Sequence, residues 1–282
     1  MPRLLAAVLA LLLAGPPPRA EAPETASRFA TLDGHRIHYQ VSGSGSQTLV
    51  FVHGWACDAS VWRLQVPYFA RDRRVVVLDL PGHGASDAPE IAYTMDLFAK
   101  SVDAVMRDAG VAKATLVGHS MGTPVVRELY RQHPEKTVAL VAVDGSLRAL
   151  FSREDAEKLL TPYRGPEYKH ALEGFVDYMI PADQAALRDE LKAVMTKTPP
   201  RIAVSAFENM IDPVNFREDP ILVPFLNVLA KSSRWPEDYE AFVRKLAPQA
   251  DYRVMDGVRH FLMLEKPDEF NAILAAFVEK QR

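Results

Sequence analysis

The pentapeptide at residues 118–122, Gly-His-Ser-Met-Gly, contains the most obvious candidate for covalent chemistry in this sequence. It fits the pattern G-x-S-x-G, in which a serine occupies a sharp turn between a strand and a helix. The apolar run at residues 114–117 predicts the strand, and residues 125–130 are expected to be helical. Glycines on both sides of the serine avoid side-chain collisions in so tight a turn. We therefore predict that Ser120 is an exposed nucleophile.

A serine that attacks a carbonyl group also needs backbone N–H donors where negative charge develops, and losing one donor typically costs about 3–4 kcal/mol of barrier. In such a turn, one donor is the residue after the serine, here Met121. The second comes from the loop after the third strand, which is predicted at residues 48–52, so the N–H of Trp55 is the candidate. We interpret His53, directly before a glycine at that strand end, as a brace for the loop rather than a base.

His260 is the predicted general base. It follows a strand predicted at residues 252–255 and a short loop that begins at Asp256, so its side chain can reach the serine across the top of a sheet. The other seven histidines lie in predicted turns, helices or a hairpin and have no matching placement. His119, next to the serine, is expected to point away from it and to be structural.

Hydrophobic patterning indicates the elements that must position these residues. Residues 28–32 and 36–41 alternate apolar and polar side chains around Asp33 and Gly34, which predicts an antiparallel hairpin. Continuous apolar runs predict buried strands, at residues 48–52, 74–79, 114–117, 138–143, 223–229 and 252–255. Amphipathic patterns predict helices at residues 58–71 and 95–108, with Asp58 and Thr94 as N-caps. Alternation of strands and helices is typical of a parallel sheet with right-handed crossovers.

Composition narrows the class of protein. The 282 residues, 48% of them hydrophobic, suffice for one large α/β domain with an insertion. A net charge of −3 and the absence of a Lys/Arg run exclude a nucleic-acid footprint, so a small molecule is the expected partner. No metal-ligand spacing, dinucleotide fingerprint or phosphate loop is present, and no cofactor is expected. We interpret Cys57, the single cysteine, as a small buried hydrophobe.

The N-terminal residues predict export. Arg3 precedes an apolar run at residues 4–14, which is too short to span a membrane and has the length of a signal-peptide core. An Ala-x-Ala site ends at Ala22, so residues 1–22 are predicted to be a signal peptide. The mature chain would then be periplasmic or extracellular, without a transmembrane anchor. An uncleaved amphiphilic tail is the alternative.

Four motifs, taken in order, resemble those of the α/β-hydrolase superfamily, and they occur at residues 53–55, 79–86, 118–122 and 259–267. The resemblance extends from residue 28 to the C-terminus. It implies an α/β fold: an eight-stranded, mostly parallel sheet with helices on both faces and a helical cap inserted after strand 6. Apolar residues recur at helical spacing, without a strand signal, from residue 147 to residue 216. We therefore divide the chain into a first core segment (23–146), the cap (147–216) and a second core segment (217–282).

The acidic member of a Ser-His-Asp triad is not where the resemblance implies. Many members of the superfamily carry it in a G-x-x-D turn after the seventh strand, but residues 230–233 read Ala-Lys-Ser-Ser. Some members use the end of the sixth strand instead, which here is Asp144, and we assign the role to it. Later carboxylates remain alternatives, namely Glu237, Asp238 and Asp212. Asp79 precedes the serine in the chain, and we expect it to hold loops together.

The predicted function is that of a secreted serine hydrolase that cleaves carboxylic esters or related acyl bonds through an acyl-enzyme. Ser120 attacks, His260 transfers protons, Asp144 orients the imidazole, and the N–H groups of Trp55 and Met121 hold the oxyanion. A C–C bond hydrolase or a cofactor-free haloperoxidase with the same triad is one alternative. A non-catalytic ligand-binding protein with this fold is another. The sequence leaves the natural substrate and the oligomeric state open.

Overall fold

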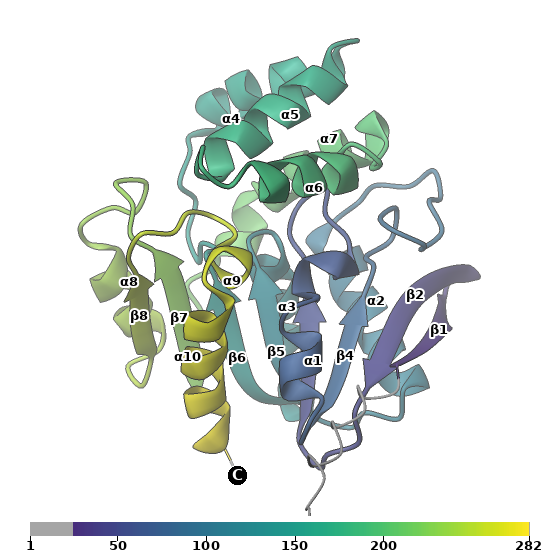
Figure 1. The fold of residues 1–282 in the computed structure, drawn as a ribbon, viewed down its shortest axis with the longest axis vertical. Coiled ribbons are helices and arrows are strands. Elements are labelled where there is room, and N and C mark those ends of the chain that lie inside the picture. Colours follow the sequence, from purple (N-terminus) through teal and green to yellow (C-terminus); the bar gives the residue numbers. More distant parts are fainter. Residues whose placement is uncertain (1–24, 282) are drawn as a thin grey trace, which may run out of the picture.

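The computed structural model describes residues 25–281, and its centre is a sheet with the strand order β1-β2-β4-β3-β5-β6-β7-β8 (Figure 1). The strands are β1 (Thr25–Leu32), β2 (His35–Ser42), β3 (Thr48–Val52), β4 (Arg74–Leu78), β5 (Ala114–His119), β6 (Thr137–Val143), β7 (Phe225–Ala230) and β8 (Asp251–Met255). Strand β2 pairs antiparallel with β1 and β4, and every other pair is parallel. The predicted eight-stranded, mostly parallel sheet is confirmed.

The hairpin and the central strands form for different reasons. Asp33 and Gly34 both have positive φ, 49° and 80°, which is the turn geometry that joins β1 to β2 with the twist a hairpin needs. Strands β5 and β7 are buried along their whole length, because helices or cap residues cover both faces of the sheet there. The parallel arrangement brings the carboxyl ends of β3 to β8 to one edge, where the predicted site residues follow.

Helices surround the sheet (Figure 1). They are α1 (Val66–Phe69), α2 (Met95–Asp108), α3 (Gly122–Gln132), α8 (Tyr239–Leu246), α9 (Leu262–Glu265) and α10 (Pro267–Glu279), and 3-10 turns occupy Ala59–Trp62 and Pro134–Lys136. In the view of Figure 1, α1 and α10 lie in front of the strands and α2 lies behind them. Thr94 caps α2 as predicted, because its side chain accepts a hydrogen bond from the N–H of Leu97.

Two predicted elements have different bounds in the structure. The single helix expected over residues 58–71 is instead a 3-10 turn followed by the short helix α1. Pro67 explains the break, since proline lacks the N–H that a helix interior requires and is tolerated only in a first turn, where α1 places it. The seventh strand begins at Phe225 rather than at residue 223, because Pro224 has no N–H to give to the sheet.

Between β6 and β7 the chain forms four helices, α4 (Arg153–Leu160), α5 (Tyr168–Met179), α6 (Ala185–Met195) and α7 (Pro200–Met210), with 3-10 turns at Thr161–Arg164 and Pro213–Phe216. They lie above the carboxyl ends of the strands (Figure 1). The division of the chain at residues 147 and 216 stays a prediction. The predicted signal peptide, residues 1–22, lies outside the described residues. No helix within residues 25–281 has both the length and the apolar character to cross a membrane.

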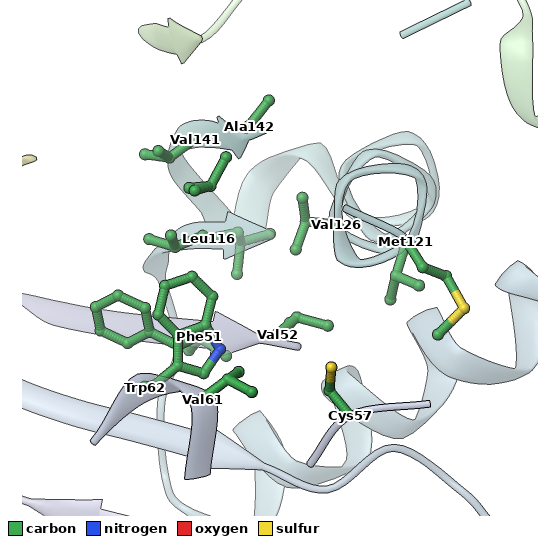
Figure 2. Close-up of a cluster of buried hydrophobic side chains, with 14 of the residues drawn as sticks. Phe51, Val52, Cys57, Val61, Trp62, Leu116, Met121, Val126, Val141 and Ala142 are labelled. Atoms are coloured by element: carbon green, nitrogen blue, oxygen red, sulfur yellow. The ribbon is translucent and has the colours of Figure 1, made fainter. Parts of the chain in front are cut away.

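A buried cluster supports the turn that carries the predicted nucleophile. Phe51 of β3 packs on Trp62 with ring centroids 4.8 Å apart, and Figure 2 shows these residues with Val126 of α3 and with Met121 and Cys57. Cys57 is almost fully buried, and burial raises the pKa of its thiol. Its surroundings match the interpretation as a small core residue, because a buried neutral thiol is a poor nucleophile.

Candidate active site

Ser120 occupies a strained turn between β5 and α3. Its φ is 51°, in the left-handed region that a residue with a side chain rarely adopts. Two backbone hydrogen bonds hold it there: its N–H donates to the carbonyl of Val143 over 2.9 Å, and its own carbonyl accepts from Thr123 over 2.9 Å. The residue is half-buried, and its hydroxyl has no hydrogen-bond partner within residues 25–281. The turn therefore presents an uncommitted hydroxyl at the end of the strand.

Close backbone approach explains the glycines around this turn. A Cβ atom added at Gly118 would lie 2.2 Å from the carbonyl oxygen of Gly122, and one at Gly122 would lie 2.5 Å from that of Val52. A Cβ at Gly54 would lie 3.0 Å from the Cβ of Ser120. The loop after β3 thus packs directly against the serine, as the predicted oxyanion role of Trp55 requires.

These contacts give a stability prediction. Gly122→Ala should lower the free energy of unfolding by about 1–3 kcal/mol, because the new methyl group meets backbone that cannot move aside cheaply. Gly174→Ala, inside α5, should raise it by up to about 1 kcal/mol, because no atom lies within 4 Å of the new Cβ and alanine favours helix. Urea unfolding of both variants checks this. An unchanged midpoint for Gly122→Ala would contradict the close approach.

The two predicted oxyanion donors are both unpaired. In the part of the chain that the structure describes, neither the N–H of Trp55 nor that of Met121 has a hydrogen-bond partner, although both residues are buried. Buried N–H groups without a partner are rare in folded proteins. Met121 also precedes the first residue of α3, where the helix dipole favours negative charge. The two N–H groups are therefore available to a ligand oxygen.

His260 lies in the loop between β8 and α9, and contacts from three elements, α9, β5 and α5, fix this loop. The Glu265 carboxylate of α9 accepts from the N–H groups of Arg259 (2.9 Å) and Phe261 (3.2 Å), on either side of the histidine. His119 Nε2 donates to the carbonyl of His260 over 2.9 Å, and the N–H of His260 donates to Met179 of α5 over 3.4 Å. The loop is therefore bonded directly to His119, the residue that precedes Ser120.

Asp144, directly after β6, is the carboxylate that contacts His260. Its Oδ2 accepts from Nδ1 of His260 over 2.7 Å, and its Oδ1 accepts from the N–H of Ala230 over 2.8 Å. Like Ser120 it has positive φ, 46°. Burial raises the pKa of this carboxyl, but hydrogen bonding to His260 and the charge of Arg234 outweigh burial and hold the pKa below its ordinary value. Asp144 is therefore an anion that holds the imidazole by one nitrogen.

The alternative carboxylates lie elsewhere. Asp238 forms an exposed ion pair with Arg148, Asp212 caps the 3-10 turn at Pro213–Phe216, and Glu237 is exposed. Asp79 accepts from the N–H groups of Ala59 (2.8 Å) and Ala85 (2.9 Å), so it joins two loops. Within the described residues, Asp144 alone among these five carboxylates bonds to His260.

The remaining histidines near the site brace it. His53 Nδ1 donates to the carbonyl of Gly54 over 2.8 Å, and its Nε2 accepts from the N–H of Leu80 over 3.0 Å, so the ring joins the loops after β3 and β4. Burial lowers the pKa of His53, and it lowers that of His119 to about 3. Both rings are thus neutral, and backbone groups bond to both nitrogens of His53 and to Nε2 of His119, which agrees with the structural roles expected for them.

A second Ser-His-Asp set, which the sequence patterns did not reveal, lies on the β1–β2 side of the sheet. Ser27 Oγ is 2.9 Å from His38 Nε2, and His38 Nδ1 is 2.8 Å from Asp79 Oδ2. A cavity of about 620 Å³ borders His38 and Asp79 but none of the predicted site residues. Ser27 sits in the regular antiparallel register of β1, opposite Gln40, and lacks the strained turn at Ser120. The three residue types in contact do not by themselves make a nucleophile.

The cap helices cover the predicted site with aromatic side chains. The indole of Trp55 has edge contacts with Tyr163, Phe175 and Phe207, at centroid distances of 5.0, 5.4 and 5.3 Å. Its Nε1 donates to the carbonyl of Ala203 in α7 over 2.7 Å. The residue that carries one predicted oxyanion N–H is thus fixed to the cap by aromatic contacts and one hydrogen bond. No group of three or more His, Cys, Asp or Glu side chains in residues 25–281 is arranged to hold a metal ion.

Comparison with known proteins identifies a matching family and two relatives of this chain. The sequence profile of the alpha/beta hydrolase family matches residues 49–273. The chain is 26% identical to the pimeloyl-(acyl-carrier protein) methyl ester esterase of Aeromonas hydrophila over 82% of this chain and 94% of that protein. It is 36% identical to the dihydrolipoyllysine-residue acetyltransferase component of the acetoin cleaving system of Cupriavidus necator, over 42% of this chain. That alignment spans only 32% of the relative's length.

Among solved structures, Est816, described as an N-acyl homoserine lactone degrading enzyme, superposes with a TM-score of 0.76 at 26% sequence identity. The superposition covers 89% of this chain and 100% of that one. A protein described as degrading a lactone therefore shares the fold described above.

Proposed function

Since this chain belongs to the alpha/beta hydrolase family, we propose that it is a serine hydrolase that cleaves carboxylic esters or lactones through an acyl-enzyme. The observation that carries the proposal is the buried contact between His260 Nδ1 and Asp144 Oδ2. The loop of His260 is also bonded to His119, the residue that precedes Ser120. This contact leaves Nε2 of His260 as the nitrogen that exchanges protons.

The proposed reaction has two halves. In the first, Ser120 Oγ attacks the carbonyl carbon while His260 Nε2 takes the hydroxyl proton, and the N–H groups of Trp55 and Met121 bind the oxyanion. The bond to the leaving alcohol then breaks, and His260 gives that alcohol its proton. In the second half, water attacks the acyl-enzyme, His260 takes a proton from the water, and Ser120 regains one as the carboxylic acid leaves. Asp144 stays ionised and stabilises the imidazolium in each half.

The aromatic side chains that pack around Trp55 support substrates with an apolar acyl or alkyl group, because their surroundings are apolar. A panel of p-nitrophenyl esters of increasing chain length and an N-acyl homoserine lactone tests the reaction class. The proposal is wrong if none is turned over and a fluorophosphonate fails to label Ser120. Halide- and peroxide-dependent halogenation, measured beside it, tests the haloperoxidase alternative.

The state of His260 gives a prediction about pH. Burial lowers the pKa of this imidazole below its ordinary value of 6.5, although the Asp144 contact opposes the shift. The base works only when it is neutral, and the neutral form predominates above its pKa. We expect kcat/KM to rise with pH to a plateau, with a midpoint below 6.5. A midpoint above 6.5 in the free enzyme, measured on a neutral ester, would contradict this.

Export is part of the proposal and rests on the sequence alone. The basic residue, apolar run and Ala-x-Ala site of residues 1–22 support it. Expression of the full chain in a Gram-negative host, followed by mass spectrometry of the periplasmic protein, should find an N-terminus near residue 23. An intact chain retained in the cytoplasm would contradict export and leave the proposed reaction unaffected.

A further inference from the structure

The loop after β7 carries a positive charge one residue beyond the position where many superfamily members have the triad acid. Arg234 lies in this loop and reaches back to β6, where its Nη2 bonds to Oδ2 of Asp144. This is the same oxygen that accepts from Nδ1 of His260 over 2.7 Å. The acid side chain is completely buried, and the arginine side chain is 22% exposed. A histidine and an arginine thus share one carboxylate oxygen in an environment with little water to screen their charges.

Further contacts fix the guanidinium in place. It lies over the ring of Trp235, with its central carbon 4.9 Å from the ring centroid. Its Nη1 is 3.9 Å from the sulfur of Met179 in α5, and the carbonyl of Met179 is the group that accepts from the N–H of His260. Arg234 therefore contacts the acid, the cap helix and an aromatic neighbour at once, which leaves its planar fork little freedom to leave Asp144.

We propose that Arg234 is a positioning residue for the acyl-transfer reaction: it holds Asp144 in the orientation that accepts from His260 and weakens the attraction of this carboxylate for the imidazolium. The inference rests on the function proposed above and adds a fourth residue to the Ser-His-Asp set. The first effect follows from geometry, because Oδ1 is bonded to Ala230 and Oδ2 to Arg234, so the carboxylate cannot rotate. The second follows from charge, because a cation next to the acid opposes a second cation on the histidine.

Several titratable groups lie near His260, and two of them act on its pKa. The titratable groups around its loop are Asp144 after β6, Arg234 after β7, His119 at the end of β5, Glu265 in α9, and Arg259 next to His260 in the chain. His119 is neutral, and Glu265 is bonded to backbone N–H groups rather than to the imidazole. From α5, backbone carbonyls meet this loop. Beyond the burial of the ring, Asp144 raises the pKa of His260 and Arg234 lowers it.

The test compares the pH dependence of four proteins: the parent, Arg234→Met, Arg234→Lys and Arg148→Met. Arg148 is a matched control, because its side chain is 24% exposed, pairs with Asp238 and lies 5.2 Å from the centroid of the Phe242 ring, yet has no contact with Ser120, Asp144 or His260. Arg234→Met keeps much of the stem and removes the charge, and Arg234→Lys keeps the charge. The readouts are kcat and KM for a p-nitrophenyl ester, and the NMR titration of the His260 ring.

With Arg234→Met we expect the acid midpoint of kcat/KM, and the NMR titration of His260, to move up by about one pH unit. Plateau kcat should fall about tenfold, a fraction of the ~10²–10⁴ that a positioned acid–base group contributes, with KM within about twofold. Arg234→Lys should restore the midpoint, and Arg148→Met should leave both midpoint and kcat unchanged. The proposal is overturned if Arg234→Met leaves the midpoint in place, or if Arg234→Lys shifts it as far.

Two controls keep the outcome decisive. If Arg234→Met does not fold, as judged by circular dichroism, Arg234→Gln replaces it, since glutamine can still bond to the carboxylate without carrying charge. If the parent turns over neither the esters nor the lactone and a fluorophosphonate fails to label Ser120, the proposed function fails. The NMR titration then still decides whether Arg234 lowers the pKa of His260, so the two failures are distinguishable.

Discussion

Ser120→Ala is expected to lower kcat for p-nitrophenyl esters by about 10⁴–10⁶-fold and to abolish labelling by a fluorophosphonate. The reason is that no other hydroxyl occupies the strained turn between β5 and α3, with two unpaired N–H groups beside it. The variant should fold normally, because alanine and serine tolerate a φ of 51° about equally. Steady-state kinetics and intact-protein mass spectrometry after labelling provide the measurements.

Ser27→Ala is the matched control for this experiment. It removes the same hydroxyl from the second Ser-His-Asp set, where Ser27 is 2.9 Å from His38. We expect its kcat to stay within about twofold of the parent and its labelling to be unchanged. Loss of activity in Ser27→Ala with retention in Ser120→Ala would reverse the assignment and place the reaction at the edge of the sheet.

Asp144→Asn is expected to lower kcat by about 10⁴-fold at the pH optimum. An amide in place of the carboxylate presents an N–H to Nδ1 of His260, which favours the wrong tautomer and leaves no proton acceptor at Nε2. The change also leaves Arg234 without its charged partner, so some loss of stability should accompany the loss of rate. Kinetics above and below the acid midpoint, together with urea unfolding, separate the two effects.

Asp238→Asn is the control for the acid assignment. Asp238 also pairs with an arginine and was an alternative from sequence, but its side chain is 69% exposed and it does not contact His260. Its variant should keep parental kcat. If instead Asp144→Asn keeps full activity while Asp238→Asn or Glu237→Gln loses it, the acid belongs to the loop after β7. The serine and histidine assignments would survive that outcome.

Local patterns predicted the fold class because each rests on short-range physics. The alternation around Asp33 and Gly34 led to the β1–β2 hairpin, and continuous apolar runs led to the buried parallel strands. The helix expected over residues 58–71 was wrong for a reason also present in the sequence. Pro67 lies inside the amphipathic pattern, and its missing N–H should have ended the helix there.

For the candidate site, the sequence supplied residue types but only part of the geometry. The glycines at 118 and 122 pointed to a tight turn at Ser120, and the strand ends suggested that Asp144 and His260 face one edge of the sheet. The two bonded residues are 116 positions apart, so their contact depends on the register of β6 and on the loop clamped by Glu265. Side-chain patterns within one segment carry no information about such a distance.

By itself, the sequence determined which elements form, which residue could be the nucleophile and that the usual acid after the seventh strand is absent. Tertiary structure alone showed that Asp144, the candidate from the sequence, contacts His260, and that Arg234 lies beside it. Arg234 bonds to a carboxylate 90 residues earlier in the chain, and the contacts Ser27–His38–Asp79 join β1, β2 and the loop after β4. Both depend on how strands distant in sequence pair and where their following loops return, and these are properties of the packed sheet rather than of any local run of residues.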